Sequence, residues 1–406
     1  APAKAEIKNI VLVSIVVLFE SIEDSDAPVY CDKFVGFLEM LLRNKENQRR
    51  LFATECICRL LESMIKGSDF EGTTRKLLIE RLMIALISRF PDKISSIRTK
   101  ALTGFSSILK VGSQSEDSRD LLIEIVSKSG DGADDQDVDM TPAATKKTPI
   151  SKNATSDAEE NDTMMDDEDD INPNNVPPSA RKSTNNMSTT STSAPHKDMT
   201  SDTGLIGARV YDVCSPVRKA AIQAIGQLAI LCPDKFLTTS FIDILKRQAM
   251  DETLTNRKQS LSTLSLLFQT FPNNEEVYRN LLIVIFILIT DLEASVMEKA
   301  LDAAKTFFIQ PYSKKSSQRS VFSVLNTLPR PQLHRVKLLF SVMHKEKMLR
   351  AAQLVKIQDF IIEKDNHHMA AWVLYEDLSQ YFPEEIDTLF IKQIYETIEN
   401  MPEDIR

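Results

Sequence analysis

The feature that most constrains the fold of this chain is a short pattern that returns about every forty residues. An acidic or polar residue is followed by an apolar residue five positions later, an arginine at six and a small residue at nine. The pattern occurs at Asn44–Ala53, Asp92–Ala101, Asp212–Ala221, Asp251–Ser260 and Asp291–Ala300. Asn256 is polar where the pattern is usually apolar, and Met297 takes the place of the last arginine. A period of about 40–47 residues with two helices per unit is typical of HEAT and armadillo repeats.

The rest of the ordered sequence favours helices. Apolar residues recur at three- and four-residue steps, for example in 51–64, 77–90 and 261–271. Prolines follow several of these segments, where a helix would stop and restart. Gly is only 10 of 406 residues, which disfavours turn-rich all-β folds and glycine-rich phosphate loops. The predicted fold class is all-α: a HEAT/armadillo-like right-handed α-solenoid with a long disordered insert, because helix pairs that cannot bury their own apolar faces must stack.

The predicted insert is acidic and poor in apolar residues. Between Asp131 and Asp170 there are 14 acidic and three basic residues, although the whole chain has a formal charge of −9. The segment is also rich in Ser, Thr and Asn, and such a composition cannot bury enough apolar surface to offset its chain entropy. We therefore divide the chain into HEAT repeats at 1–127, a disordered insert at 128–204, HEAT repeats at 205–310 and less regular helical repeats at 311–406.

Two apolar runs are too short to span a membrane. Ile10–Phe19 and Leu281–Thr290 are each about ten residues long, whereas a span needs about 20. Both are predicted to be buried helices, and no membrane partner is expected. The chain lacks a secretory signal peptide and an initiator Met, which indicates a processed start or a piece of a longer protein. Five cysteines form no disulfide framework and suit a reducing compartment.

The residues of the repeated pattern have a structural interpretation. The aspartate is expected in the turn between the two helices of a repeat, where it can cap the second helix or pair with an arginine of a neighbouring repeat. Arg98, Arg218 and Arg257 would form such a ladder. Ser215 is expected to cap a helix at its N-terminus with Pro216 behind it.

Basic residues beside the pattern are the candidates for contact with DNA or a partner, because the structural position does not require them. A stripe of such residues would bind phosphates independently of base sequence. The alternative is an ordinary solvated face. The candidates beside the pattern are Lys100, Lys219 and Lys258, and a basic cluster beyond the last clear repeat adds Lys314, Lys315 and Arg319.

Catalytic and cofactor motifs are not apparent. The sequence has no P-loop, and the series Asp135, Asp137, Asp139 lacks the glycine and the final glutamate of a calcium loop. Cys56 and Cys58 fit core packing better than metal binding, since no second Cys/His pair accompanies them. We therefore predict a protein that is not an enzyme, with no cofactor, no metal and no small-molecule substrate.

The insert contains two proline-directed phosphorylation candidates, Thr141 and Thr148, each followed by proline. Added charge in an exposed segment would disturb no core. The alternative is a chance match in a threonine-rich region.

Four strings in series resemble a known family. They are ISRFPDKISSIRTKALTGFSSIL (87–109), ARVYDVCSPVRKAAIQAIGQLAIL (208–231), RQAMDETLTNRKQSLSTLSLLFQTFP (247–272) and LITDLEASVMEKALDAAKTFFI (288–309). Together they resemble the central HEAT region of the D-type regulatory subunit of condensin, most like the condensin II version. Ala370–Leu374 resembles a helix farther along in the same subunit, and the D-type subunits are much longer than this chain.

The resemblance implies a non-catalytic subunit that acts in mitotic chromosome condensation and segregation in the nucleus, on mitotic chromosomes. Its partners would be the kleisin and SMC subunits and chromatin DNA, bound without sequence specificity. The alternative is a HEAT scaffold of another class, such as a nuclear transport receptor or a phosphatase scaffold. That alternative predicts regular repeats to both ends and an acidic inner face for a basic cargo.

Overall fold

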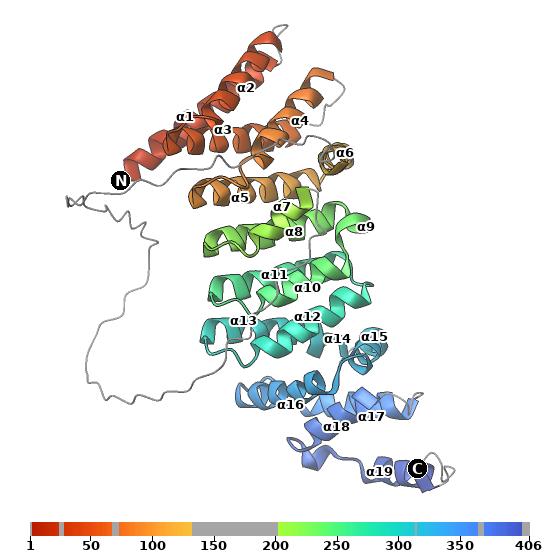
Figure 1. Cartoon of the computed structure of the whole chain (residues 1–406). Helices are drawn as coiled ribbons and strands as arrows, with labels where there is room; N and C mark the ends of the chain where they lie inside the picture. The colour runs from red at the N-terminus through yellow and green to blue at the C-terminus, as the bar shows by residue number, and fades with distance from the viewer. Residues whose placement is uncertain are drawn as a thin grey trace, which may run out of the picture. The chain divides into compact units, whose positions relative to one another are not determined.

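The computed structural model describes residues 2–23, 28–66, 73–131, 202–312, 315–363 and 369–399. Within these ranges all regular secondary structure is helical (Figure 1). The first six helices are α1 (Pro2–Glu23), α2 (Pro28–Leu42), α3 (Asn47–Lys66), α4 (Thr73–Ile87), α5 (Ser95–Gly112) and α6 (Glu116–Asp131). After the gap come α7 (Asp202–Arg209), α8 (Ser215–Leu231), α9 (Pro233–Phe236), α10 (Thr239–Gln248), α11 (Leu254–Thr270), α12 (Glu275–Leu288) and α13 (Ala294–Ala304).

The remaining helices are less uniform in type and length. A π-helical turn, η1 (Lys305–Ile309), continues α13 and is followed by the short α14 (Gln310–Tyr312). The chain then forms α15 (Lys315–Asn326), α16 (Arg330–Lys345), α17 (Ala351–Glu363), α18 (Met369–Ser379), the 3₁₀ turn η2 (Pro383–Glu385) and α19 (Thr388–Glu399).

Helices stack in two layers. The second helices of successive pairs contact one another in the order α3, α5, α8, α11 and α13, as Figure 1 shows. The first helices form the other layer, in which α2 contacts α4, α4 contacts α6, and α10 contacts α12. Each layer buries the apolar side of the other, and the buried residues form one continuous core. The predicted all-α, HEAT/armadillo-like solenoid is therefore confirmed.

The small residue of the repeated pattern lies where the two layers meet. Ala101, Ala221, Ser260 and Ala300 are all completely buried. Glycines bring two pairs of second helices still closer. A Cβ added to Gly104 of α5 would lie 2.1 Å from Cys58 Sγ of α3, and one added to Gly226 of α8 would lie 2.4 Å from Thr263 Cγ2 of α11.

The predicted insert separates α6 from α7 in the sequence. α6 contacts α4, α5 and α7, α7 also contacts α8, and α5 packs directly on α8. Because α6 continues to Asp131 and α7 starts at Asp202, both helices run a few residues into the range 128–204, and the division of the chain into these parts stays a prediction. Residues 128–131 contain no apolar side chain that would have indicated helix. The insert itself lies outside the described residues.

The two apolar runs differ in burial. Leu281–Thr290 in α12 is almost entirely buried, as predicted. Ile10–Phe19 in α1 is not: among its large apolar residues Ile10, Val13 and Leu18 are at least half exposed. Since α1 packs on α2 and α3 from one side, only Leu12 and Phe19 of the run are fully buried. Every helix in the described ranges falls short of the length or apolar content that a bilayer crossing requires.

Candidate functional site

The turns between paired helices are built around the aspartate of the repeated pattern. In each turn, one carboxylate oxygen accepts a hydrogen bond from the backbone N–H two residues later. This bond is 3.0 Å at Asp92, 3.0 Å at Asp212, 2.8 Å at Asp251 and 2.9 Å at Asp291. Asn44 makes the same bond, at 2.9 Å, in the first turn. The acceptor stabilises the turn that precedes the helix and not the helix N-terminus itself, which corrects the capping role expected from sequence.

The aspartate of each of these four turns is also bound by an arginine from the second helix of the preceding helix pair. Arg50 donates to Asp92 at 3.0 and 3.1 Å, and Arg98 donates to Asp212 at 2.8 Å. Two further pairs are bidentate, as Arg50–Asp92 is: Arg218 donates to Asp251 at 2.8 and 2.9 Å, and Arg257 donates to Asp291 at 2.7 and 2.8 Å. We call these four pairs the Arg–Asp ladder. It confirms the structural role predicted for Arg98, Arg218 and Arg257.

The ladder arginines also close their own turns. Each donates to the carbonyl oxygens of the two residues six and five positions earlier, such as Arg218 to Asp212 at 3.0 Å and to Val213 at 3.1 Å. The same two bonds recur at Arg50, Arg98 and Arg257. Each guanidinium therefore connects a turn with the turn of the next repeat.

The ladder has clear electrostatic consequences. Burial raises the pKa of Asp92, Asp212 and Asp251, but hydrogen bonds from arginine and from the backbone outweigh burial, so each pKa lies below its usual value. Bonds to Asp251, despite burial, raise the pKa of Arg218. These ion pairs are satisfied internally, so the ladder arginines are poor candidates for a binding surface.

A row of lysines on consecutive second helices is a better candidate. Lys219 of α8 is exposed, while Lys258 of α11 and Lys299 of α13 are half-buried. Burial, followed by the charges of Lys258 and Lys219, lowers the pKa of Lys299 below its usual value, so both lysines lie within electrostatic range of Lys299, whose ammonium group also donates to Ser262 Oγ at 2.5 Å. No ion pair involves any of them within the described part of the chain. We call these three residues the lysine row; an arrangement of this kind favours an anion.

Lys299 was not among the residues predicted from the sequence to contact DNA or a partner. It follows Met297 by two positions, as Lys100 follows Arg98 by two, whereas Lys219 and Lys258 follow their arginines by one. The spacing of Lys100 was therefore the signal that could have identified it. Lys100 is half-buried in α5, and its charge acts on the thiol of Cys58 in α3.

Of the other predicted contact residues, the structure describes only the position along the chain. Lys315 and Arg319 lie in α15. Lys314 lies outside the described residues, as do the phosphorylation candidates Thr141 and Thr148.

The helix cap predicted at Ser215 is wrong. Ser215 is already the first residue of α8, and the preceding Cys214 occupies the cap position with no side-chain hydrogen bond. The Ser215 hydroxyl instead donates to Thr253 Oγ1 at 3.0 Å, which joins two successive turns.

The two close cysteines lie in the core. Cys56 and Cys58 are buried in α3, and burial is the main cause that raises the pKa of each thiol to about 12. Both are thiols with weak nucleophilic character at neutral pH. Across the described ranges, no group of three or more His, Cys, Asp or Glu side chains could hold a metal ion.

Comparison with known proteins gives similarities of fold only. No family model and no curated protein matches the chain. Among solved structures, the Pds5-Scc1 complex aligns with 95% of this chain and 47% of that chain, at 11% identity and a TM-score of 0.48. Importin beta aligns with 92% of this chain and 40% of that chain, at 8% identity and a TM-score of 0.39. A designed armadillo repeat protein aligns with 85% of this chain and 99% of that chain, at 12% identity and a TM-score of 0.36.

This chain spans less than half the length of the first two of these structures. The helix pairs, the two layers and the repeated turns of the chain itself identify it as a HEAT-repeat solenoid.

Proposed function

We propose that this chain is a non-catalytic HEAT-repeat subunit of a condensin II-like complex. It would act in mitotic chromosome condensation and segregation, in the nucleus and on mitotic chromosomes. Its partners would be the kleisin and SMC subunits of the complex, together with chromatin DNA. The support is the series of four strings that resembles the D-type subunit, now located on α4–α5, α7–α8, α10–α11 and α12–α13.

The lysine row is the observation that favours DNA. Lys219 and Lys258 lie within electrostatic range of Lys299 on three successive second helices, and no carboxylate of the described residues forms an ion pair with any of the three. DNA presents phosphates at regular intervals, and neutralising them releases counterions. Lysine is suited to this contact because it acts as a point charge on a long flexible stem and needs no exact geometry.

The alternative scaffold classes are less well supported. A transport receptor or phosphatase scaffold was expected to have an acidic inner face and regular repeats to both ends. Here α8, α11 and α13 present lysines. The regular pattern also changes at Met297 and at the π-helical turn η1. Both features favour the first proposal.

Partner identification tests the proposal most broadly. The chain, carrying an affinity tag, is used to capture proteins from a mitotic extract, which are then identified by mass spectrometry. SMC and kleisin proteins are the expected partners. Recovery of transport cargo or phosphatase subunits in their place would contradict the condensin assignment.

DNA binding tests the lysine row itself. A triple variant, Lys219→Gln, Lys258→Gln and Lys299→Gln, is compared with a control that changes Lys110, Lys235 and Lys305 to Gln, which are exposed lysines elsewhere. We expect the first variant to reduce the slope of log affinity against log salt by roughly 2–3, since each phosphate contact contributes about 0.9. The control removes the same net charge and should keep nearly the original slope. An equal reduction of the slope in both variants would show only a general effect of net charge and would contradict DNA binding by the lysine row.

A further inference from the structure

A recess lies between two successive turns near the start of the stack. It has a volume of about 540 Å³ and is formed by the turn joining α2 to α3 and the turn joining α4 to α5. Five cationic side chains and one carboxylate line it: Arg43, Lys45, Arg50, Arg89, Lys93 and Asp92. The recess is thus strongly positive in composition.

The single carboxylate is already neutralised. Asp92 is only 4% exposed, accepts two bonds from Arg50 and lies 3.5 Å from Arg89 Nη1. Arg43, Lys45 and Lys93 are exposed, and none of them forms an ion pair among the described residues. Three cations therefore line this recess without an ion-pair partner among the described residues.

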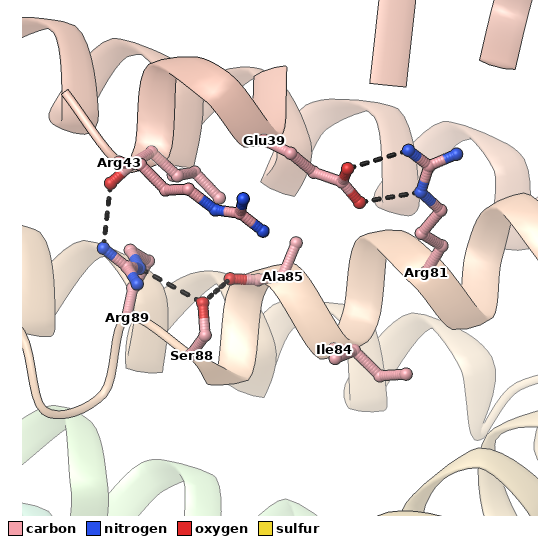
Figure 2. A pocket seen from close by; sticks show the side chains of 8 residues that line it. Glu39, Arg43, Arg81, Ile84, Ala85, Ser88 and Arg89 are labelled. Carbon is pink, nitrogen blue, oxygen red and sulfur yellow. Dashed lines mark hydrogen bonds and ion pairs between the residues drawn. The ribbon is translucent and has the colours of Figure 1, made fainter. Parts of the chain in front are cut away.

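A smaller cavity of about 210 Å³ adjoins the recess and shares Arg43 and Arg89 with it (Figure 2). Its carboxylate is also occupied, because Glu39 accepts two bonds of 2.7 Å from the guanidinium of Arg81. Figure 2 shows the Arg43 guanidinium in this cavity, between the Glu39–Arg81 pair and Arg89. The Glu39 carboxylate is thus held by Arg81, and the charge of Arg43 acts on it as a smaller influence without forming an ion pair.

Arg89 is held in position before any ligand binds. It donates to the Leu42 carbonyl at 2.9 Å and to Ser88 Oγ at 3.2 Å, while Ser88 donates to the Ala85 carbonyl at 2.7 Å. Burial is the main cause that lowers its pKa, and the charges of Arg50 and Arg43 add to that effect. An anion between these guanidinium groups would relieve the repulsion at little cost in side-chain ordering.

A lysine directly after the turn aspartate or asparagine is specific to the first two turns of the pattern. The residue after the turn aspartate or asparagine is Lys45 in the first turn and Lys93 in the second. At the same position the next three turns have Val213, Glu252 and Leu292. The recess is therefore not a by-product of the repeated architecture, which places neutral and acidic residues there elsewhere.

We propose that this recess binds the phosphate group of a phosphorylated side chain in a segment of a partner protein. A phosphate monoester is a compact dianion with three acceptor oxygens, which planar guanidinium groups bind through paired hydrogen bonds. The open recess is bordered by a turn on either side, and its lining includes the apolar residues Leu42, Pro91 and Ile94, which suit the residues next to the phosphate. A DNA backbone, by contrast, is matched by an extended row of charges, as on α8, α11 and α13. This proposal is independent of the condensin assignment.

A binding assay with the full chain tests the site. The probe is a fluorescein-labelled peptide Ala-Gly-phosphoserine-Ala-Gly, with the unphosphorylated peptide, inorganic phosphate and a short DNA duplex as comparisons. The test variant combines Arg43→Gln with Lys93→Gln, both at exposed positions. The control combines Lys66→Gln with Lys110→Gln, which lie at the opposite ends of α3 and α5.

We expect the phosphopeptide to bind at least about tenfold more tightly than the unphosphorylated peptide, because charge-assisted bonds are the strong ones. The test variant should lose most of that preference and the control should keep it. Equal binding of the two peptides, or an unchanged preference in the test variant, would overturn the proposal. Inorganic phosphate should compete only at concentrations far above that of the peptide, and equally strong competition would overturn the assignment to a protein segment. DNA affinity that falls in the test variant, without any phosphopeptide preference, would assign the recess to DNA instead.

Discussion

The stack is held together differently before and after Met297. From Asn44 to Asp291, every turn is joined to the next by an arginine that binds an aspartate. Met297 occupies the next arginine position, and the π-helical turn η1 follows a few residues later. Within the described residues, the ladder does not continue beyond this point. One chain can therefore keep the same layered packing while changing the interactions that fix one repeat on the next.

Beyond Met297, aromatic rings take a larger part in joining the helices. Phe286 meets Phe308 edge to face at 5.7 Å between ring centroids, and Phe308 stacks on Phe340 at 6.2 Å. Farther on, Phe322 and Phe360 lie 4.4 Å apart, and Trp372 stacks on Phe390 at 6.0 Å. Such contacts are adaptable, since ring pairs tolerate several geometries. Bidentate ion pairs in the ladder fix one relative position of two turns.

The largest expected effect is that of Arg218→Met, which places at a ladder position the methionine that stands at position 297. Arg218 is 7% exposed and binds Asp251 and two carbonyls, so Arg218→Met leaves a buried carboxylate without its main partner. Removing one member of a buried pair costs roughly 3–5 kcal/mol. We expect a drop of that size in the free energy of unfolding, measured by urea denaturation.

Arg49→Met is the matched control for this variant. Arg49 is more than half exposed and pairs only with the equally exposed Glu46, so its loss should change stability by less than about 1 kcal/mol. If Arg218→Met were as mild as the control, the ladder would have no structural importance.

Acid should affect the two regions in opposite directions. Asp92, Asp212 and Asp251 have pKa values below the ordinary 3.8, so their stabilising effect is complete above that pH and is lost as the pH falls through their folded-state pKa values. In α18, burial raises the pKa of Asp377 above 3.8, so its ionised form destabilises the folded state. This destabilisation is relieved as the pH falls through the folded-state pKa of Asp377. Hydrogen exchange should therefore show α18 gaining protection on mild acidification and α5, α8 and α11 losing it only below about pH 3.8. Simultaneous loss in both regions would contradict these assignments.

A smaller effect is expected from a close contact between two second helices in the ladder region. In Gly104→Ala, the new Cβ would lie 2.1 Å from Cys58 Sγ and 3.0 Å from Cys58 Cβ, so either the Cys58 side chain or α5 itself must shift. Overpacking costs typically 1–3 kcal/mol, and the better helix propensity of alanine returns up to about 1 kcal/mol. Thermal unfolding should show a net loss. Gly36→Ala is the control: its nearest neighbouring atom is at 3.7 Å, and we expect it to be neutral or stabilising. No glycine follows Gly226, so the later region has no equivalent contact to break.

The repeated pattern predicted most of what joins the repeats. The interval between aspartate and arginine correctly identified Arg98, Arg218 and Arg257 as structural, because a contact that recurs in every repeat leaves a recurring spacing. The exposure of α1 was not predictable, since an apolar run does not reveal how many neighbours a helix has. The recess was missed for a similar reason: Arg43 and Lys93 come from different turns and share no sequence motif.

The lysine row was predicted in part. Lys219 and Lys258 stand directly after ladder arginines, and their common spacing drew attention to them. Lys299 follows Met297 in place of an arginine, so the spacing that identified Lys219 and Lys258 did not identify Lys299. Asn256 is a similar exception within the ladder: it is fully buried at a position that is apolar in the neighbouring repeats, and its amide finds no well-aligned hydrogen-bond partner. A buried amide of this kind carries an energetic cost that a sequence pattern does not reveal.

The most direct test of the central claim is a double-mutant cycle between Arg98 and Asp212. These residues are 114 positions apart in sequence, on either side of the predicted insert, yet their side chains are 2.8 Å apart. The single variants Arg98→Met and Asp212→Asn and the double variant are compared by urea unfolding. If the two blocks stack as adjacent repeats of one solenoid, we expect a coupling energy of about 1–3 kcal/mol. Additive effects, within about 0.5 kcal/mol, would mean that the two blocks do not meet and would contradict the account.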